Sequence, residues 1–149
     1  MSSFKDTEGR TWTLRITVST IRRIKDLAGV DFADLDMFNQ GGGLFEVTSD
    51  YLKFGAILYA ICKPEADARS VQEEAFLDAI SGEVLETATR AFVEAVADFF
   101  PPSRGNLIRQ TLQAAEKVRE QALKQAGEKL TEVMETSSDL LKNLPEFAE

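Results

Sequence analysis

The pattern of apolar residues changes period abruptly near the N-terminus. Over residues 11–18 polar residues alternate with four apolar ones, which are Trp12, Leu14, Ile16 and Val18. Alternation with a period of two predicts a β-strand with one buried face. Directly afterwards Ile21, Ile24 and Leu27 recur with helical spacing, and Gly29 follows as a helix C-cap. With almost no spacer between them, the strand and the helix must cover one core.

The strand has a partner just before it in the sequence. Residues 4–6 predict a short first strand, and residues 7–10 predict a turn in which Gly9 takes a positive φ. Ser19 or Thr20 is the expected N-cap of the helix that follows. An isolated two-stranded hairpin is marginal in water, so its apolar face is expected to lie on helices.

The rest of the chain is predicted to be helical. Asp31 is the expected cap of a short helix, and three consecutive glycines, residues 41–43, predict a loop. Lys63-Pro64 should end the next helix, and residues 70–73 predict a capping box at the start of the one after it. Residues 136–138 predict a polar break before a short tail helix. The main helices are expected over residues 50–62, 70–80, 83–100 and 103–135.

These elements predict a mainly α fold. We expect a compact helical domain with a short N-terminal β-hairpin, over residues 1–101, and a C-terminal helical extension built on a long amphipathic helix, over residues 102–149. Five to seven helices are expected in all. The predicted core residues are Trp12, Leu14, Ile16, Ile24, Leu58, Phe92 and Val96.

Charge and composition exclude several classes of partner. The 149 residues include 17 basic and 25 acidic side chains, a net charge of −8, whereas nucleic-acid-binding domains present a basic face. Nucleic acid is therefore not expected as a partner. A membrane is not expected either, because the longest apolar run, residues 54–62, is too short to span a bilayer. The single cysteine, Cys62, lies in that run and is expected to be a buried apolar residue in a reducing interior.

No residue pattern predicts chemistry. The chain has no histidine, which removes the usual general base and most zinc sites. Carboxylate pairs such as Asp34 and Asp36 belong to no recognisable catalytic or calcium-binding motif. We therefore expect no catalytic, cofactor-binding or metal-binding residues, no cofactor, and a protein that is not an enzyme.

The C-terminal helix has a thin, alanine-rich apolar stripe between charged flanks. Such a helix buries little alone, so it is expected either to pair with another helix, including that of a second copy, or to fold back on residues 50–100. Aromatic residues near the glycine loop and before Pro101 are further candidates for a partner-facing role. The candidate partner-binding residues are Phe38, Phe45, Phe100, Leu112, Val118, Ala122, Leu130 and Val133.

The N-terminal two thirds of the chain resemble a known family. The first matching positions are Phe4, Asp6, Gly9, Arg10, Trp12, Leu14, Ile16, Val18, Ile21, Ile24 and residues 27–31; the others lie in residues 58–64, 76–83 and 98–101. This pattern resembles the tail assembly chaperones of tailed bacteriophages and prophages, which are encoded between the tail-tube and tape-measure proteins. The resemblance covers residues 4–101 and does not extend beyond Pro101.

The resemblance implies a function without chemistry. A tail assembly chaperone would bind the tape-measure protein and keep it soluble in the cytoplasm of the bacterial host, with the tail-tube protein as a second candidate partner. Self-association is expected from the stripe of the C-terminal helix. The alternative is a structural tail or head–tail adaptor component of the virion, which should assemble into stable rings.

Overall fold

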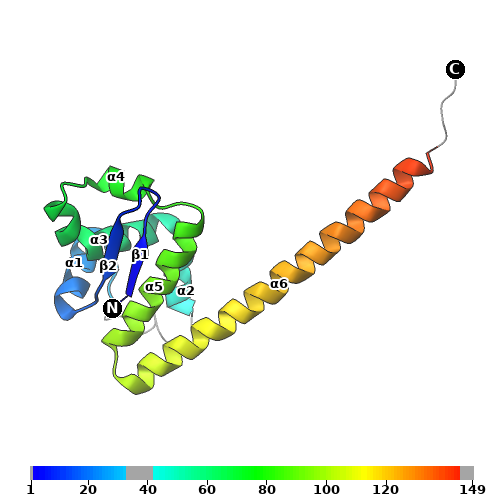
Figure 1. Cartoon of the computed structure of the whole chain (residues 1–149). Helices are drawn as coiled ribbons and strands as arrows, with labels where there is room; N and C mark the ends of the chain where they lie inside the picture. Colours follow the sequence, from blue (N-terminus) through cyan, green and yellow to red (C-terminus); the bar gives the residue numbers. More distant parts are fainter. Residues whose placement is uncertain (1, 33–41, 145–149) are drawn as a thin grey trace. The chain divides into compact units, whose positions relative to one another are not determined.

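The computed structural model describes residues 2–32 and 42–144 and is mainly helical, with an N-terminal antiparallel hairpin (Figure 1). The predicted fold class is confirmed. The chain divides into two compact units, Met1–Thr111 and Leu112–Glu149. The elements are β1 (Ser2–Lys5), β2 (Thr11–Leu14), α1 (Val18–Ala28), α2 (Gly42–Ser49), α3 (Tyr51–Ala68), α4 (Glu73–Asp78), α5 (Glu83–Phe99) and α6 (Pro102–Lys142).

The hairpin is shorter than its sequence pattern suggests. β1 pairs with β2 in the register Phe4 to Trp12, and β2 ends at Leu14. The predicted strand to residue 18 is wrong, because Thr17 is already the N-cap of α1 and accepts a hydrogen bond from the backbone N–H of Thr20. Val18 is consequently 74% exposed, and Ile16 is half-buried rather than part of the core.

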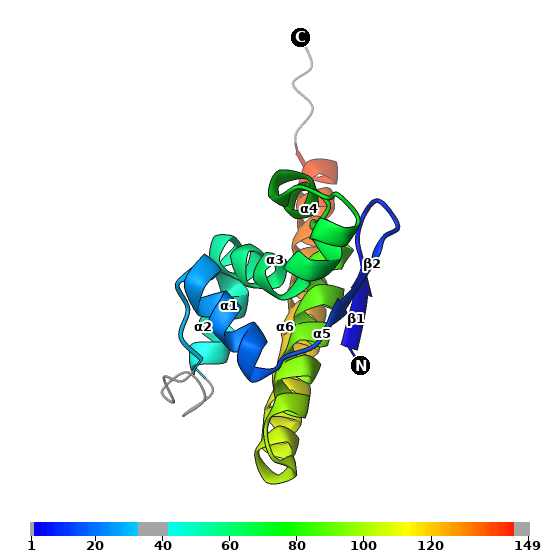
Figure 2. The same ribbon diagram turned by 90° about the vertical axis from the view of Figure 1, so that its left-hand side faces the viewer.

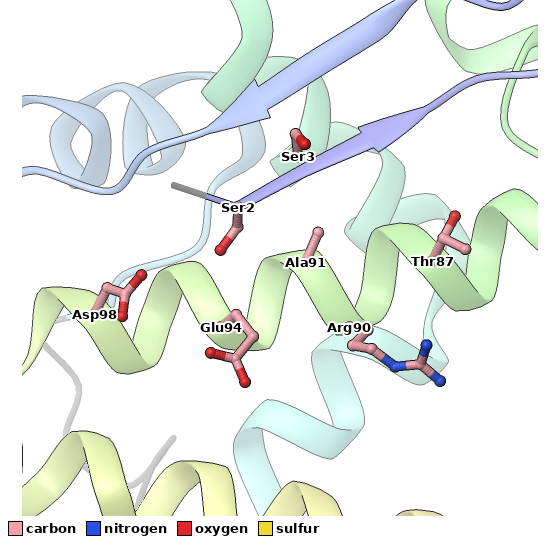
Figure 3. Close-up of a pocket in the computed structure, with 7 residues that line it drawn as sticks. All are labelled: Ser2, Ser3, Thr87, Arg90, Ala91, Glu94 and Asp98. Atoms are coloured by element: carbon pink, nitrogen blue, oxygen red, sulfur yellow. The ribbon is translucent and has the colours of Figure 1, made fainter.

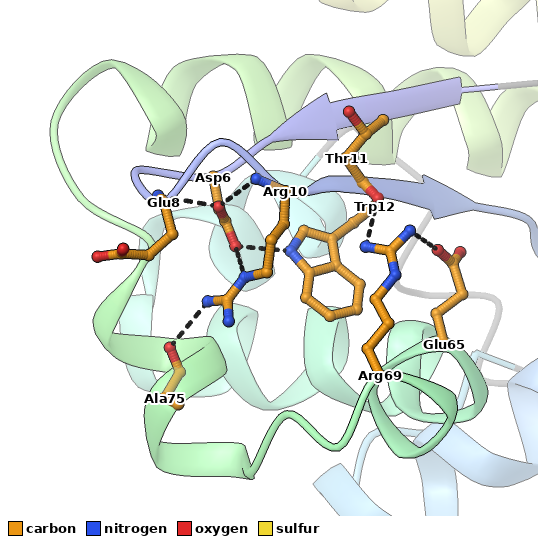
Figure 4. Close-up of polar contacts among 8 residues, drawn as sticks. All are labelled: Asp6, Glu8, Arg10, Thr11, Trp12, Glu65, Arg69 and Ala75. Atoms are coloured by element: carbon orange, nitrogen blue, oxygen red, sulfur yellow. Dashed lines mark hydrogen bonds and ion pairs between the residues drawn. The ribbon is translucent and has the colours of Figure 1, made fainter.

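A buried carboxylate organises the hairpin turn (Figure 4). Asp6 Oδ1 accepts hydrogen bonds from the backbone N–H groups of Glu8 and Arg10, at 3.0 and 2.9 Å. Asp6 Oδ2 accepts from Arg10 Nε and from Trp12 Nε1, both at 2.8 Å. Burial of the carboxyl opposes its ionisation, but these hydrogen bonds and the charge of Arg10 outweigh burial and hold the pKa of Asp6 below its usual value.

Trp12 joins this turn to the helices. Its ring is fully buried and meets Phe76 of α4 edge to face, with ring centroids 5.0 Å apart. The guanidinium of Arg69, at the end of α3, lies over the other part of the indole, 4.8 Å from the ring centroid. The hairpin is therefore held by the helical core rather than by its own ladder.

Two side chains of the α3 C-terminal region cover the outer edge of β2. Glu65 Oε1 accepts a hydrogen bond from the backbone N–H of Thr13 at 3.1 Å. Arg69 donates to the carbonyl of Thr11 at 2.8 Å (Figure 4). The same two side chains form an ion pair, with 3.4 Å between nitrogen and oxygen. A backbone edge that could otherwise pair with another strand is thus satisfied inside the chain.

The core of the first unit is built around α3 and α5. α1, α2 and α4 lie against α3, and β1 runs along α5 (Figure 2). Phe92 of α5 is fully buried and contacts Phe54 of α3 edge to face, at 5.5 Å between centroids. The predicted core positions Trp12, Leu14, Ile24, Leu58, Phe92 and Val96 are all confirmed as buried.

Cys62 is fully buried in α3, as predicted. Burial raises the pKa of its thiol, and the nearby charge of Glu65 acts in the same direction. The thiol is therefore a packing group that stays protonated.

Pro64 does not end its helix. α3 continues from Tyr51 to Ala68 with the proline inside it, so the predicted stop at residues 63–64 is wrong. A proline lacks the N–H that would bond the carbonyl four residues earlier, here that of Ala60. Arg23 of α1 supplies the missing donor, because its Nη1 lies 3.0 Å from the Ala60 oxygen and 3.3 Å from that of Ile61. A tertiary contact thus compensates for the proline.

Several predicted boundaries are also wrong. The capping box is not formed, because Ser70 has φ of 56° and Gln72 is the N-cap of α4. Gly42 and Gly43 lie in α2 rather than in a loop. No break interrupts α6 at residues 136–138, where Thr136 instead bonds the carbonyl of Glu132 within the helix, at 2.9 Å.

Replacement of Phe92 by alanine should lower the free energy of unfolding by roughly 3–5 kcal/mol, because a fully buried ring is removed from between α3 and α5. Chemical denaturation of both proteins measures the difference. The exposed Leu52, 89% accessible, is the control position, and its replacement by alanine should change stability by less than about 0.5 kcal/mol. Equal effects at the two positions would contradict the placement of Phe92.

Asp6→Asn should destabilise the protein by roughly 2–3 kcal/mol near neutral pH, because an amide nitrogen would face the donors of Arg10 or Trp12. The pKa of Asp6 in the folded protein lies below its ordinary value of 3.8, so the stabilisation is present above that pH and is lost as pH falls through the folded pKa. Denaturation curves from pH 7 to pH 2 should therefore converge for the two proteins at the acidic end. A constant difference would contradict ionisation of Asp6.

Candidate protein-binding surface

The first turns of α6 are attached closely to α5. Gly105 is buried, and a Cβ added to it would lie 2.5 Å from the backbone oxygen of Ala97. Only a residue without a side chain permits this approach of the two backbones. α6 begins at Pro102, whose missing N–H would have no partner in a first helical turn.

Charged side chains reinforce the attachment. Arg109 of α6 forms ion pairs with Glu94, at 3.0 Å, and with Asp98, both on α5. The hydrogen bond to Glu94 raises the pKa of Arg109, and the charges of both carboxylates add to the effect. Exposed ion pairs contribute little stability singly, but this one arginine bridges two carboxylates one turn apart and fixes the starting angle of α6.

The two adjacent phenylalanines before Pro101 serve this same junction. Phe99 and Phe100 meet edge to face with centroids 5.2 Å apart, and both are half-buried. Arg104 of α6 lies over the Phe100 ring, 5.8 Å from its centroid. Phe100, a predicted partner-binding residue, therefore contributes part of its surface to the turn between α5 and α6.

The second unit carries a continuous apolar stripe on α6. Small and large apolar side chains recur along it mostly at spacings of three and four residues, interrupted by Arg119 and Ser137, and those of Leu130 and Val133 are 61% and 60% exposed. The opposite side of the helix is mainly polar, with residues such as Lys117, Gln121, Lys124, Glu128 and Glu135. The stripe consists of Leu112, Ala115, Ala122, Leu123, Ala126, Leu130, Val133, Met134, Leu140 and Leu141, with Leu144 just beyond the helix.

The structure places the predicted partner-binding residues in different environments. Ala122, Leu130 and Val133 are exposed on the stripe, and Leu112 is half-buried at its start. Val118 is 66% exposed but lies at the edge of the stripe, a quarter turn from its centre. Phe38 lies outside the described residues; Phe45 is in α2, but its side chain is not among those described. Of the predicted residues that the structure describes in the second unit, four thus lie on the stripe and Val118 lies at its edge.

Half of the stripe was missed by the sequence analysis. Leu123 and Met134 are each 64% exposed on it, and Leu140, Leu141 and Leu144 extend it by three turns. The signal was present, since these residues continue the spacing of three and four. The expected break at residues 136–138 excludes Leu140, Leu141 and Leu144, whereas Leu123 and Met134 precede it and are marked by their spacing alone.

Two hollows of the first unit are open to solvent. The larger, about 500 Å³ and open to solvent, lies where β1 meets α5 and is lined by Ser2, Ser3, Thr87, Arg90, Ala91, Glu94 and Asp98 (Figure 3). Its two carboxylates are the ones already bridged by Arg109. Among the described residues, no cluster of three or more cysteine, aspartate or glutamate side chains could hold a metal ion.

Comparisons with protein-family models, with curated proteins and with solved structures give no match to this chain. In the described part of the chain, none of the helices combines the length and apolar character needed to cross a membrane.

Gly105→Ala should lower the free energy of unfolding by roughly 1–3 kcal/mol, because the new methyl group collides with the Ala97 carbonyl and the backbones must separate. Gly127→Ala is the matched control in the same helix, where nothing lies within 4 Å of an added Cβ. It should raise helix stability by roughly 0.5–1 kcal/mol. Thermal unfolding followed by circular dichroism measures both. Equal behaviour of the two variants would contradict the close contact at Gly105.

Proposed function

We propose that this protein is a tail assembly chaperone of a tailed bacteriophage or prophage, which binds the tape-measure protein and keeps it soluble in the host cytoplasm during tail assembly. It acts without enzymatic chemistry and is absent from the finished particle. The observation that carries the proposal is the exposed apolar stripe of α6, whose opposite face is mainly polar.

The stripe suits an amphipathic helix as its ligand. Leu130, Val133 and Met134 present large exposed side chains, whereas Ala122 and Ala126 allow close approach of another backbone. Helices recognised in this way contribute apolar residues at the same three- and four-residue spacing. A long tape-measure protein of helical, apolar character would offer many such segments, and the acidic surface of the chaperone, net charge −8, would keep the complex soluble.

The N-terminal unit supports a binding role. The first residues that carry the family resemblance build the hairpin: Asp6 binds Arg10 and Trp12, and Gly9 has a positive φ of 81°. Their side chains are used in folding. The unit therefore closes its own core and leaves the second unit to meet the client.

Co-expression with the tape-measure protein encoded downstream tests the proposal. We expect the client to be soluble with the wild-type chain and insoluble alone. Leu123→Lys with Leu130→Lys should abolish this effect, since both charges enter the stripe. Gln121→Lys with Thr131→Lys adds the same charge off the stripe and should leave the effect unchanged. The readout is the soluble fraction of the client.

Two outcomes would overturn the proposal. One is a client whose solubility is the same with and without the chain. The other is recovery of the chain in stoichiometric amount from mature virions, which would favour the alternative function of a structural tail or head–tail adaptor component.

A further inference from the structure

We propose that in the absence of a client the stripe of α6 pairs with the stripe of a second copy of this chain, with the two helices antiparallel. In this arrangement Ala115 lies opposite Leu141 of the other chain, Ala126 lies opposite Leu130, and Arg119 lies opposite Ser137. The proposal does not depend on the identity of the client.

The continuity of α6 makes this pairing possible. The helix is unbroken through Ser137, so residues 112–142 form one straight surface about 46 Å long. The large side chains of that surface are exposed in the single chain, including Leu130 at 61% and Leu141 at 69%. Such an exposed stripe is stabilised when another helix removes it from water.

Side-chain sizes along the stripe are complementary in the antiparallel direction. The small residues of the stripe, three alanines, all lie in its N-terminal half beside Leu112 and Leu123, whereas the apolar residues of its C-terminal half are all large. Reversal of the second helix brings large side chains against small ones, which fills the space between the helices. The pairs are Ala115 with Leu141, Ala122 with Met134 and Ala126 with Leu130, flanked by Leu123 with Val133 and Leu112 with Leu144.

The polar residues within the stripe favour the same direction. Arg119 and Ser137 lie at the centre of the stripe, and both are exposed. Antiparallel pairing in this register places the guanidinium of one chain beside the hydroxyl of the other, where it can donate a hydrogen bond. Parallel, in-register pairing would instead bring Arg119 against Arg119 and Ala126 against Ala126, which combines charge repulsion with a poorly filled seam.

The register also places Glu116 of one chain at the height of Leu140 of the other, on the margins of the stripe. Every position of the stripe is thereby assigned a partner, and the same surface becomes unavailable to a client until the pair separates.

Disulfide cross-linking of the full-length chain tests the direction. Ala115→Cys and Leu141→Cys proteins, one of them tagged, are mixed and oxidised with oxidised glutathione. A disulfide needs Cα atoms within about 7 Å, and in the antiparallel pair two copies of residue 115 are about 39 Å apart. We expect the mixed disulfide as the main product and almost none between identical chains. Cys62 is buried and does not contribute.

Two further mixtures make the result decisive. Ala122→Cys with Met134→Cys should give the mixed disulfide as well. Lys117→Cys with Asp139→Cys occupies matching heights on the polar face and should give none. Disulfides between identical chains at residue 115 would overturn the direction. Absence of all cross-links, or a monomer by light scattering at high concentration, would overturn the pairing itself and leave the chaperone proposal standing.

Discussion

The ionised Asp6 carboxylate is the contact on which the hairpin depends. Four-residue strands cannot hold a two-stranded sheet alone, so the turn must be fixed by other means. Asp6 accepts four hydrogen bonds at 2.8–3.0 Å, from the backbone of the turn and from the side chains of Arg10 and Trp12. Trp12 in turn packs against Phe76 and so attaches the hairpin to the helical core.

α3 connects the hairpin to the other helices of the first unit. Glu65 and Arg69 complete the hydrogen bonds along the edge of β2. Pro64, directly before Glu65, leaves the Ala60 carbonyl without its helical donor, and Arg23 of α1 satisfies it. The C-terminal half of one helix therefore binds the hairpin on one side and α1 on another. Polar groups that could recognise a ligand are largely used within the fold, which is consistent with the proposal of a protein without chemistry.

The second unit follows a different principle. Its apolar residues lie on one stripe of a single helix, where Leu123 and Met134 are each 64% exposed. A helix of this kind gains stability only when it meets another helix. If both proposals hold, a second copy and the client would compete for one surface, and the free energy of pairing between copies would set how readily the client is accepted.

The sequence by itself determined the elements whose patterns are local. The alternation around Trp12 and Leu14 predicts a strand, Gly29 ends α1 with φ of 71°, and the apolar spacing around Phe92 marks a buried helix face. Each depends on backbone geometry or on periodicity, which neighbouring residues reveal. The stripe of α6 was found in part for the same reason.

Only the tertiary structure decided the outcome where local preference and long-range contact compete. Pro64 favours a helix end, yet Arg23, far away in sequence, replaces the lost donor and α3 continues. Glycine and serine are weak helix formers, but Gly43 in α2 and Ser137 in α6 lie inside helices whose neighbouring residues outweigh that preference. The length of the stripe depends on the continuity of α6 through Ser137, because this continuity places Leu140 and Leu141 on the same side of the helix as Leu130.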